Sequence, residues 1–192
     1  MYQITRLLCL CVLLLIAGVA MATETRSPFL LSVGLGLNAT SVDAGSNHWY
    51  DYGSTLGEGT GGAFDFKLGV FATPQIPIFY TLKVTAYDQN DGNGYWQPYH
   101  TVFSGVGASY YFSPTNPSFY LTGGVGATQW GVSDSSSIDT TGAGGFVGLG
   151  YAFSKHFAIE GIIMGGESSD SYYYDTPYSR FTTTMITLNA ML

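Results

Sequence analysis

A strict two-residue alternation across residues 105–130 constrains the fold of this chain more than any other feature. On its first arm, GVGASYYF, apolar side chains occupy every second position: Val106, Ala108, Tyr110 and Phe112. After the turn SPTNPS, the second arm, FYLTGGVGATQW, alternates in the same way. Because successive side chains of a β-strand point to opposite sides, the segment predicts a β-hairpin with two distinct faces.

The second face of this hairpin is small or polar, rich in glycine and almost free of charge. Only 10% of the whole chain is charged, against roughly 25% in soluble domains. No run of about 18 apolar residues follows the N-terminal segment, which excludes helical membrane spans from the body of the chain. An apolar face opposite a face of small residues is typical of a narrow barrel whose outer surface contacts lipid and whose interior is crowded with side chains.

The N-terminus predicts a cleavable export signal. Arg6 precedes a continuous apolar stretch, and Ala20-Met21-Ala22 fits the small-x-small cleavage rule. The expected domains are therefore a signal peptide over 1–22 and an outer-membrane β-barrel domain over 23–192. Both cysteines, at positions 9 and 11, lie in the signal, so the mature chain is expected to have no disulfide and no thiolate chemistry.

Eight alternating segments make up the rest of the chain. They are expected at residues 29–39, 62–71, 78–87, 99–112, 119–130, 142–153, 157–166 and 180–192. Long polar connections alternate with short turns, as in membrane barrels with short periplasmic turns and longer external loops. Closure removes sheet edges that lipid cannot hydrate. The predicted fold is all-β, an eight-stranded antiparallel up-and-down transmembrane β-barrel, with both chain ends on the short-turn side.

Acidic residues gather in the predicted long connections, where Arg180 is the only nearby basic residue. They are Asp43, Asp51, Glu58, Asp88, Asp91, Asp134, Asp139, Glu167, Asp170 and Asp175. Solvated loop charges explain this pattern most simply. An acidic rim repels nucleic acid, whose binding depends on Lys and Arg contacts to phosphate, so no nucleic-acid partner is expected.

Three stretches carry a likeness to a known family: GVGASYYF, FYLTGGVGATQWG and TGAGGFVGLGYAFSKHFAIEG. They resemble the small outer-membrane β-barrel family of OmpA/OmpX-type and opacity-like surface proteins, most clearly over residues 102–166. The resemblance implies a porin-like barrel in a Gram-negative cell outer membrane. Its implied partners are outer-membrane lipids, lipopolysaccharide and, during biogenesis, the barrel-assembly machinery. Such proteins commonly end in an aromatic residue, whereas this chain ends in Leu192.

Four charged residues are expected to point into the lumen: Asp65, Lys67, Lys83 and Glu160. A charge in a narrow, poorly hydrated interior must be paired, because leaving it unpaired costs several kcal/mol. The interior of an eight-stranded barrel is just filled by side chains. The four residues are therefore interpreted as a structural salt-bridge cluster, with a gate on a narrow ion path as the alternative.

Catalysis was weighed because some small outer-membrane barrels modify lipid A with a His/Ser pair. His100 and Ser104 share one face of a strand but lie four residues, or roughly 13 Å, apart. A base must lie within about 3 Å of its nucleophile. His48 falls in a loop and His156 in a turn at the opposite end. No catalytic residue, metal site or cofactor is therefore predicted.

Tyrosine and tryptophan are concentrated among acids in the expected external loops. The candidate interaction residues are Trp49, Tyr50, Tyr52, Tyr95, Trp96, Tyr172, Tyr173, Tyr174 and Tyr178. Aromatic residues of this kind are favoured in recognition surfaces. The predicted function is a non-catalytic structural and surface-interaction barrel, adhesin-like through these loops, with a host or envelope partner that the sequence does not name. The alternatives are a narrow or gated channel for small solutes and a lipid A-modifying enzyme.

Overall fold

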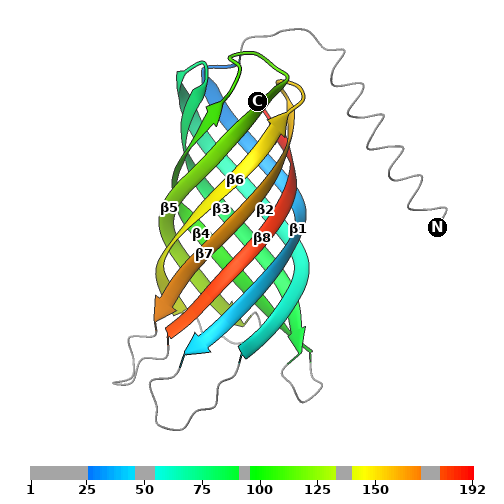
Figure 1. The fold of residues 1–192 in the computed structure, drawn as a ribbon, viewed down its shortest axis with the longest axis vertical. Coiled ribbons are helices and arrows are strands. Elements are labelled where there is room, and N and C mark those ends of the chain that lie inside the picture. Colours follow the sequence, from blue (N-terminus) through cyan, green and yellow to red (C-terminus); the bar gives the residue numbers. More distant parts are fainter. Residues whose placement is uncertain (1–25, 46–54, 91–95, 133–139, 170–177) are drawn as a thin grey trace, which may run out of the picture.

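A computed structural model describes residues 26–45, 55–90, 96–132, 140–169 and 178–192. They form eight strands: β1 (Phe29–Gly45), β2 (Thr55–Thr73), β3 (Ile76–Asn90), β4 (Trp96–Tyr111), β5 (Ser118–Val132), β6 (Thr140–Ala152), β7 (Phe157–Ser169) and β8 (Tyr178–Met191). Each strand pairs antiparallel with its sequence neighbours, and β8 returns to pair with β1 (Figure 1). The predicted closed eight-stranded barrel is confirmed. The expected signal peptide over 1–22 lies outside the described residues.

Closure depends on the pairing of the first and last strands. The β1–β8 register runs without a break from Ser32 opposite Met191 to Gly45 opposite Tyr178. The sheet therefore has no free edge with unpaired backbone groups, which is what a lipid environment demands. Within the described ranges, no helix is long and apolar enough to cross a membrane.

The two faces of each strand separate as the alternation predicts. Large apolar side chains cover the outside of the barrel, including Leu35 and Val125, which are 68% and 67% exposed. Residues next to them in sequence turn inward, where polar residues such as Thr81 and Thr122 are buried. In the opening hairpin, Tyr110 lies outside and Tyr111 inside. The wall is thus apolar toward its surroundings and mixed toward its lumen.

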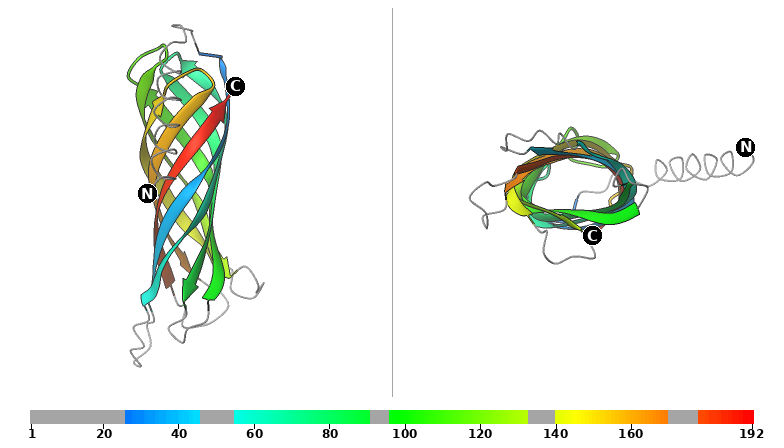
Figure 2. Two further views of the ribbon diagram at one scale, coloured as in Figure 1. Left: turned by 90° about the vertical axis from the view of Figure 1, so that its right-hand side faces the viewer. Right: turned by 90° about the horizontal axis from the view of Figure 1, so that it is seen from below.

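The ends of the barrel differ, as expected. Both described chain ends lie at the end that holds the short connections, residues 74–75, 112–117 and 153–156 (Figures 1 and 2). We call this the turn end. The opposite loop end is where residues 46–54, 91–95, 133–139 and 170–177 join the strands. The predicted contrast in connection length is weaker than expected, because 91–95 is shorter than 112–117.

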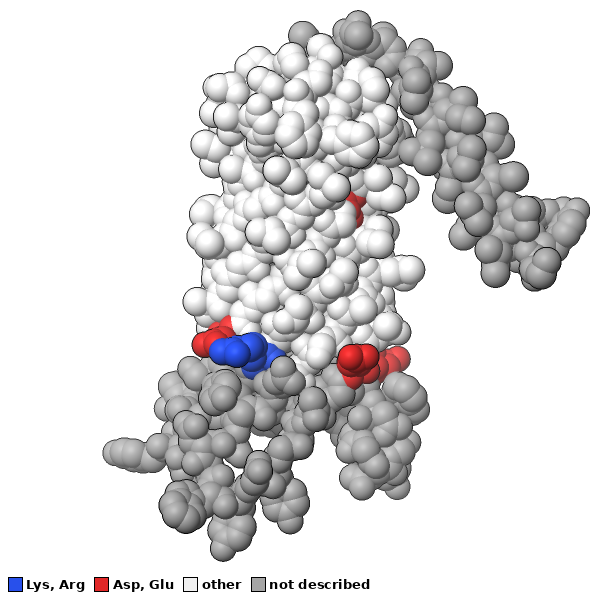
Figure 3. Space-filling view, in the orientation of Figure 1, with Lys and Arg blue, Asp and Glu red and all other residues white. Residues whose placement is uncertain are grey.

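The strands continue further toward the loop end than the sequence predicted. β1 ends at Gly45 rather than residue 39, and β2 begins at Thr55 rather than residue 62. The placement of Asp43, Glu58, Asp88 and Glu167 in loops was therefore wrong, since all four lie on strands. The side chains of Glu58, Asp88 and Glu167 are exposed. Figure 3 shows charged side chains gathered at this end, below an almost uncharged wall.

Side-chain polarity is reversed in these outer strand segments, which we call the collar. Its outward residues are polar: Glu58, Thr60, Asp88, Glu167, Arg180 and Thr182. Its inward residues include large apolar or aromatic side chains: Val42, Tyr87, Tyr99, Trp130, Met164 and Phe181. This is the pattern of a barrel in water, and strands of 13–19 residues exceed the 9–11 or so that cross a bilayer.

Aromatic side chains fill the collar. The Tyr99 ring stacks between Tyr87 and Trp130, with centroid distances of 6.0 and 5.4 Å. Trp130 Nε1 donates a 2.9 Å hydrogen bond to Tyr87 Oη. Closer to the turn end than this stack, the rings of Phe103 and Phe146 meet edge to face at 5.3 Å. The outer half of the lumen is consequently packed with rings.

Glycines facing the lumen make room for these large side chains. A Cβ atom at Gly124 would lie 2.6 Å from Phe146 Cε1. A Cβ atom at Gly150 would overlap the ring of Tyr120. The volume of the rings opposite them therefore explains the glycines at positions 107 and 124 of the opening hairpin.

Candidate functional site in the barrel lumen

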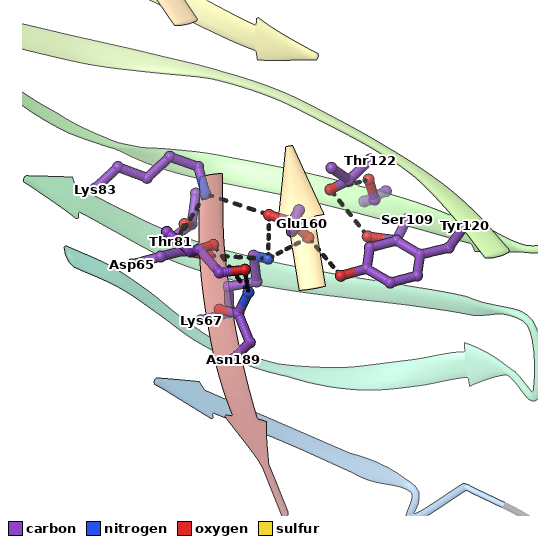
Figure 4. Close-up of polar contacts among 11 residues, drawn as sticks. Asp65, Lys67, Thr81, Lys83, Ser109, Tyr120, Thr122, Glu160 and Asn189 are labelled. Atoms are coloured by element: carbon purple, nitrogen blue, oxygen red, sulfur yellow. Dashed lines mark hydrogen bonds and ion pairs between the residues drawn. The ribbon is translucent and has the colours of Figure 1, made fainter. Parts of the chain in front are cut away.

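Four charged side chains meet in the lumen toward its turn end. Asp65 and Lys67 lie on β2, Lys83 on β3 and Glu160 on β7. All four are buried, and Asp65 and Lys83 have no exposed surface. Asp65 lies directly opposite Lys83 in the β2–β3 register. The closure of the sheet brings Glu160 to them across the lumen (Figure 4).

The four groups form a compact ion-pair ring. Lys67 Nζ lies 2.6 and 2.7 Å from the two carboxylate oxygens of Glu160 and 3.0 Å from Asp65 Oδ2. Lys83 Nζ lies 2.6 Å from Asp65 Oδ1 and 4.0 Å from Glu160 Oε1. Two ammonium groups and two carboxylates balance to zero net charge. Each charge therefore has an opposite charge in contact, which is the condition for burying it.

Neutral side chains complete the ring. Tyr120 Oη donates a 2.7 Å hydrogen bond to Glu160 Oε2, and Thr81 Oγ1 donates a 3.4 Å bond to Asp65 Oδ1. Lys83 Nζ lies 4.5 Å from the centroid of the Phe146 ring, within cation–π range. The sequence placed Tyr120 on the inward face but did not identify it as a partner of Glu160. The alternation determines on which side of the wall a side chain lies. It does not determine which residue that side chain contacts across the lumen.

Arg26 covers the turn end of the lumen. Its guanidinium donates hydrogen bonds to Ser113 O at 2.7 Å, Asn116 Oδ1 at 2.9 Å and Thr115 O at 3.3 Å. The same group stacks over the Tyr111 ring at 3.8 Å. Burial lowers the pKa of Arg26 from its ordinary value, although a guanidinium still stays protonated in proteins. The segment before β1 thus crosses the barrel opening to the β4–β5 turn.

Arg26 was not among the residues that the sequence singled out. Its available signal is its position, as a cation three residues before the first strand. The turn residues that it binds are 87 to 90 positions away in sequence. No local pattern links groups so far apart.

Comparisons with known proteins give structural neighbours only. No family model matches the chain, and no curated protein matches it. Among solved structures, the outer membrane protein OprG of Pseudomonas aeruginosa is similar at 13% identity and a TM-score of 0.53, covering 89% of this chain and 99% of its own. Neisserial surface protein A matches at 15% identity and a TM-score of 0.52, covering 87% and 99%. Ail, the attachment invasion locus protein of Yersinia pestis, matches at 12% identity and a TM-score of 0.51, covering 86% and 100%.

The chain has the fold of the small outer-membrane β-barrels. This agrees with the resemblance seen in GVGASYYF and the two later stretches. Identities of 12–15% establish the shared fold alone, and the activity of this chain must be argued from its own residues.

Two of the residues considered for catalysis lie at separate places in the described part of the chain. Ser104 Oγ lies 2.8 Å from Tyr80 Oη on the outer wall. His156 lies at the turn end, with Nδ1 3.2 Å from the carbonyl oxygen of Met191. His48 falls outside the described residues. Across the described ranges, no group of three or more His, Cys, Asp or Glu residues could hold a metal ion.

The loop aromatics predicted as an interaction surface cannot be placed as side chains. Trp49, Tyr50, Tyr52, Tyr95, Tyr172, Tyr173 and Tyr174 lie outside the described residues. Trp96 and Tyr178 begin β4 and β8, but their side chains also lie outside the description. The fold nevertheless gathers the ends of all four connections at the loop end of the barrel.

Proposed function

We propose that this protein is a structural and surface-interaction barrel of a bacterial outer membrane. It would span the membrane with its turn end in the periplasm and present its loops outside, without a catalytic role. The observation that carries this proposal is the combination of an apolar, edge-free wall with a lumen that is packed with aromatic rings and ion pairs.

The side chains that fill the lumen argue for a structural barrel that holds the loops rather than for an open pore. Side chains that are fully buried in it include Phe103, Phe181 and Met185 in addition to the charged ring. Rings occupy the collar, ion pairs lie toward the turn end, and Arg26 covers the opening. An eight-stranded interior is just wide enough for such side chains.

Specificity then falls to the loops. Their Tyr and Trp residues are interspersed with acids, a composition that suits contact with another surface. The collar holds the ends of these connections together, and we propose adhesin-like contact with a host or envelope partner. The acidic side chains make a basic or cation-bridged partner surface the favoured chemistry.

Protease treatment of intact cells tests the placement. We expect cleavage near Tyr172–Tyr174 on intact cells, with the barrel protected. A heat-dependent gel shift after detergent extraction would report the folded barrel. Protein that is soluble without detergent, or loops that are cut only after the outer membrane is permeabilised, would overturn the proposal. Replacing Tyr172–Tyr174 with serine is then expected to weaken surface attachment while leaving the gel shift unchanged.

A gated channel is the second candidate, because charges and orphaned polar groups line the lumen. Thr85 Oγ1 and Asn189 Oδ1 are buried with no hydrogen-bond partner, which is where internal water would bind. Single-channel recording tests it: conductance that changes in Lys83→Met and Glu160→Gln variants would favour the channel. If neither the unaltered protein nor the two variants conducts, the structural role is favoured. Mass spectrometry of lipid A from cells with and without the gene tests the enzymatic alternative, for which we expect no difference.

A further inference from the structure

A cavity of about 270 Å³ opens at the turn end, between Arg26 and the wall. Its lining combines a cationic side with an apolar side. Arg26 and Lys155 supply the cationic side, and His156 also lines the cavity. Leu30, Phe71 and Met191 belong to the apolar side. Phe29 and Leu192, which are strongly exposed on the outer wall, also line it. The cavity is thus bounded by residues of both the lumen and the lipid-facing surface.

Asn116 is the unexplained group in this cavity. Its side chain lines the cavity and is only 3% exposed. The orientation of the amide is fixed, because Oδ1 accepts a 2.9 Å bond from Arg26, which has only donors to offer. Nδ2 therefore faces the other way, and it is buried without any hydrogen-bond partner. Such an orphaned donor is costly unless an acceptor reaches it.

Arg26 adds a positive charge beside this donor. Its acceptors among the described residues are carbonyl and amide oxygens, which satisfy its N–H groups without neutralising its charge. An anion in the cavity would accept from Asn116 Nδ2 and balance the guanidinium at once. Charge-assisted bonds of this kind are stronger than neutral ones.

We propose that this cavity is a binding site for a phosphate-type oxyanion attached to a hydrocarbon. The phosphate would accept from Asn116 Nδ2 beside Arg26, and the hydrocarbon would lie over Leu30 and Phe71. The volume equals that of roughly nine water molecules at about 30 Å³ each, enough for a headgroup but not for a whole phospholipid. The acyl chains would extend out of the cavity, past Phe29 and Leu192, and lie along the outer wall. A lipid headgroup and free phosphate share this chemistry.

The test uses the full mature chain, folded in micelles of a neutral sugar detergent that contains no phosphate. One titration adds inorganic phosphate and another adds short-chain phosphatidylglycerol, each followed by ³¹P NMR. We expect saturable binding in at least one titration, with a matching shift of the Asn116 side-chain amide signal in ¹⁵N spectra. Saturation by inorganic phosphate would identify a soluble anion as sufficient. Saturation by phosphatidylglycerol alone would identify a lipid headgroup.

Two variants and one matched control decide the assignment. Asn116→Asp keeps the size and the acceptor for Arg26 but replaces the orphaned donor with a carboxylate. We expect it to weaken binding by at least about tenfold. Arg26→Gln is expected to weaken binding as well, while Arg180→Gln removes the same charge at the loop end and should change nothing. A heat-dependent gel shift confirms that each variant is folded. Absence of saturation with both ligands, or equal affinity in Asn116→Asp, would overturn the proposal.

Discussion

The buried ion-pair ring makes a sharp prediction about which substitutions the barrel tolerates. Lys83→Met removes one of two positive charges and leaves two carboxylates facing Lys67 alone. Asp65→Leu removes one of two negative charges and leaves two ammonium groups facing Glu160. Each single change should strongly destabilise the barrel. The double variant should not, because Lys67, Glu160 and Tyr120 remain as a neutral, hydrogen-bonded set.

The magnitudes follow from the geometry. Both side chains are fully buried and their charged atoms lie 2.6 Å apart. Removing one partner of a buried pair costs about 3–5 kcal/mol, whereas replacing both with apolar groups of similar volume is often neutral or stabilising. The two single variants together should therefore cost about 6–10 kcal/mol, and the double variant about 0–2 kcal/mol. Their coupling energy should exceed about 4 kcal/mol.

Reversible urea unfolding in lipid vesicles, followed by tryptophan fluorescence, measures the free energy of unfolding of all four proteins. The matched control is the Arg180–Glu167 pair of the collar, whose side chains are 61% and 60% exposed. Replacing those two residues with glutamine, singly and together, should give a coupling below about 1 kcal/mol. If Lys83→Met costs less than about 1 kcal/mol, or if the buried pair couples no more than the exposed one, the reasoning about the lumen is wrong.

Three further substitutions test the lumen, its glycines and the outer wall by the same unfolding measurement. Tyr120→Phe removes the neutral donor of Glu160 and should cost about 1.5–3 kcal/mol. Gly150→Ala drives a Cβ atom into the Tyr120 ring and should cost about 1–3 kcal/mol. Val125→Lys puts a charge on the lipid-facing wall and should cost about 2–4 kcal/mol. The matched controls, in the same order, are Tyr151→Phe, Gly62→Ala and Thr182→Lys. A control that costs as much as its partner would contradict the assigned environment.

Much of the fold could be predicted because a strand has a period of two. That period alone placed Lys67, Lys83 and Glu160 on one side of the wall and Val125 on the other. The eight segments follow from the same alternation, and their even number places both chain ends on the short-turn side. These features depend only on neighbours in the sequence, so a single sequence carries them.

What could not be predicted depends on distant parts of the chain. Lys67 and Glu160 are 93 residues apart, and their contact is set by how the sheet closes. The extra strand residues at the loop end were missed for a different reason. Their polar outward side chains, such as Glu58 and Asp88, resemble a loop in a scan for lipid-facing strands, because the collar faces water.

In the proposed membrane placement, the collar also sets how far the loops stand above the lipid surface. A strand rises about 3.3 Å per residue, and a tilt of about 40° turns this into roughly 2.5 Å along the barrel axis. Residues 40–45 of β1 therefore lift the first loop by about 15 Å. The collar thus sets the height of the loops above the lipid-facing part of the wall. Adding or removing collar residues in pairs would change that height without altering the lipid-facing wall or the ion-pair ring.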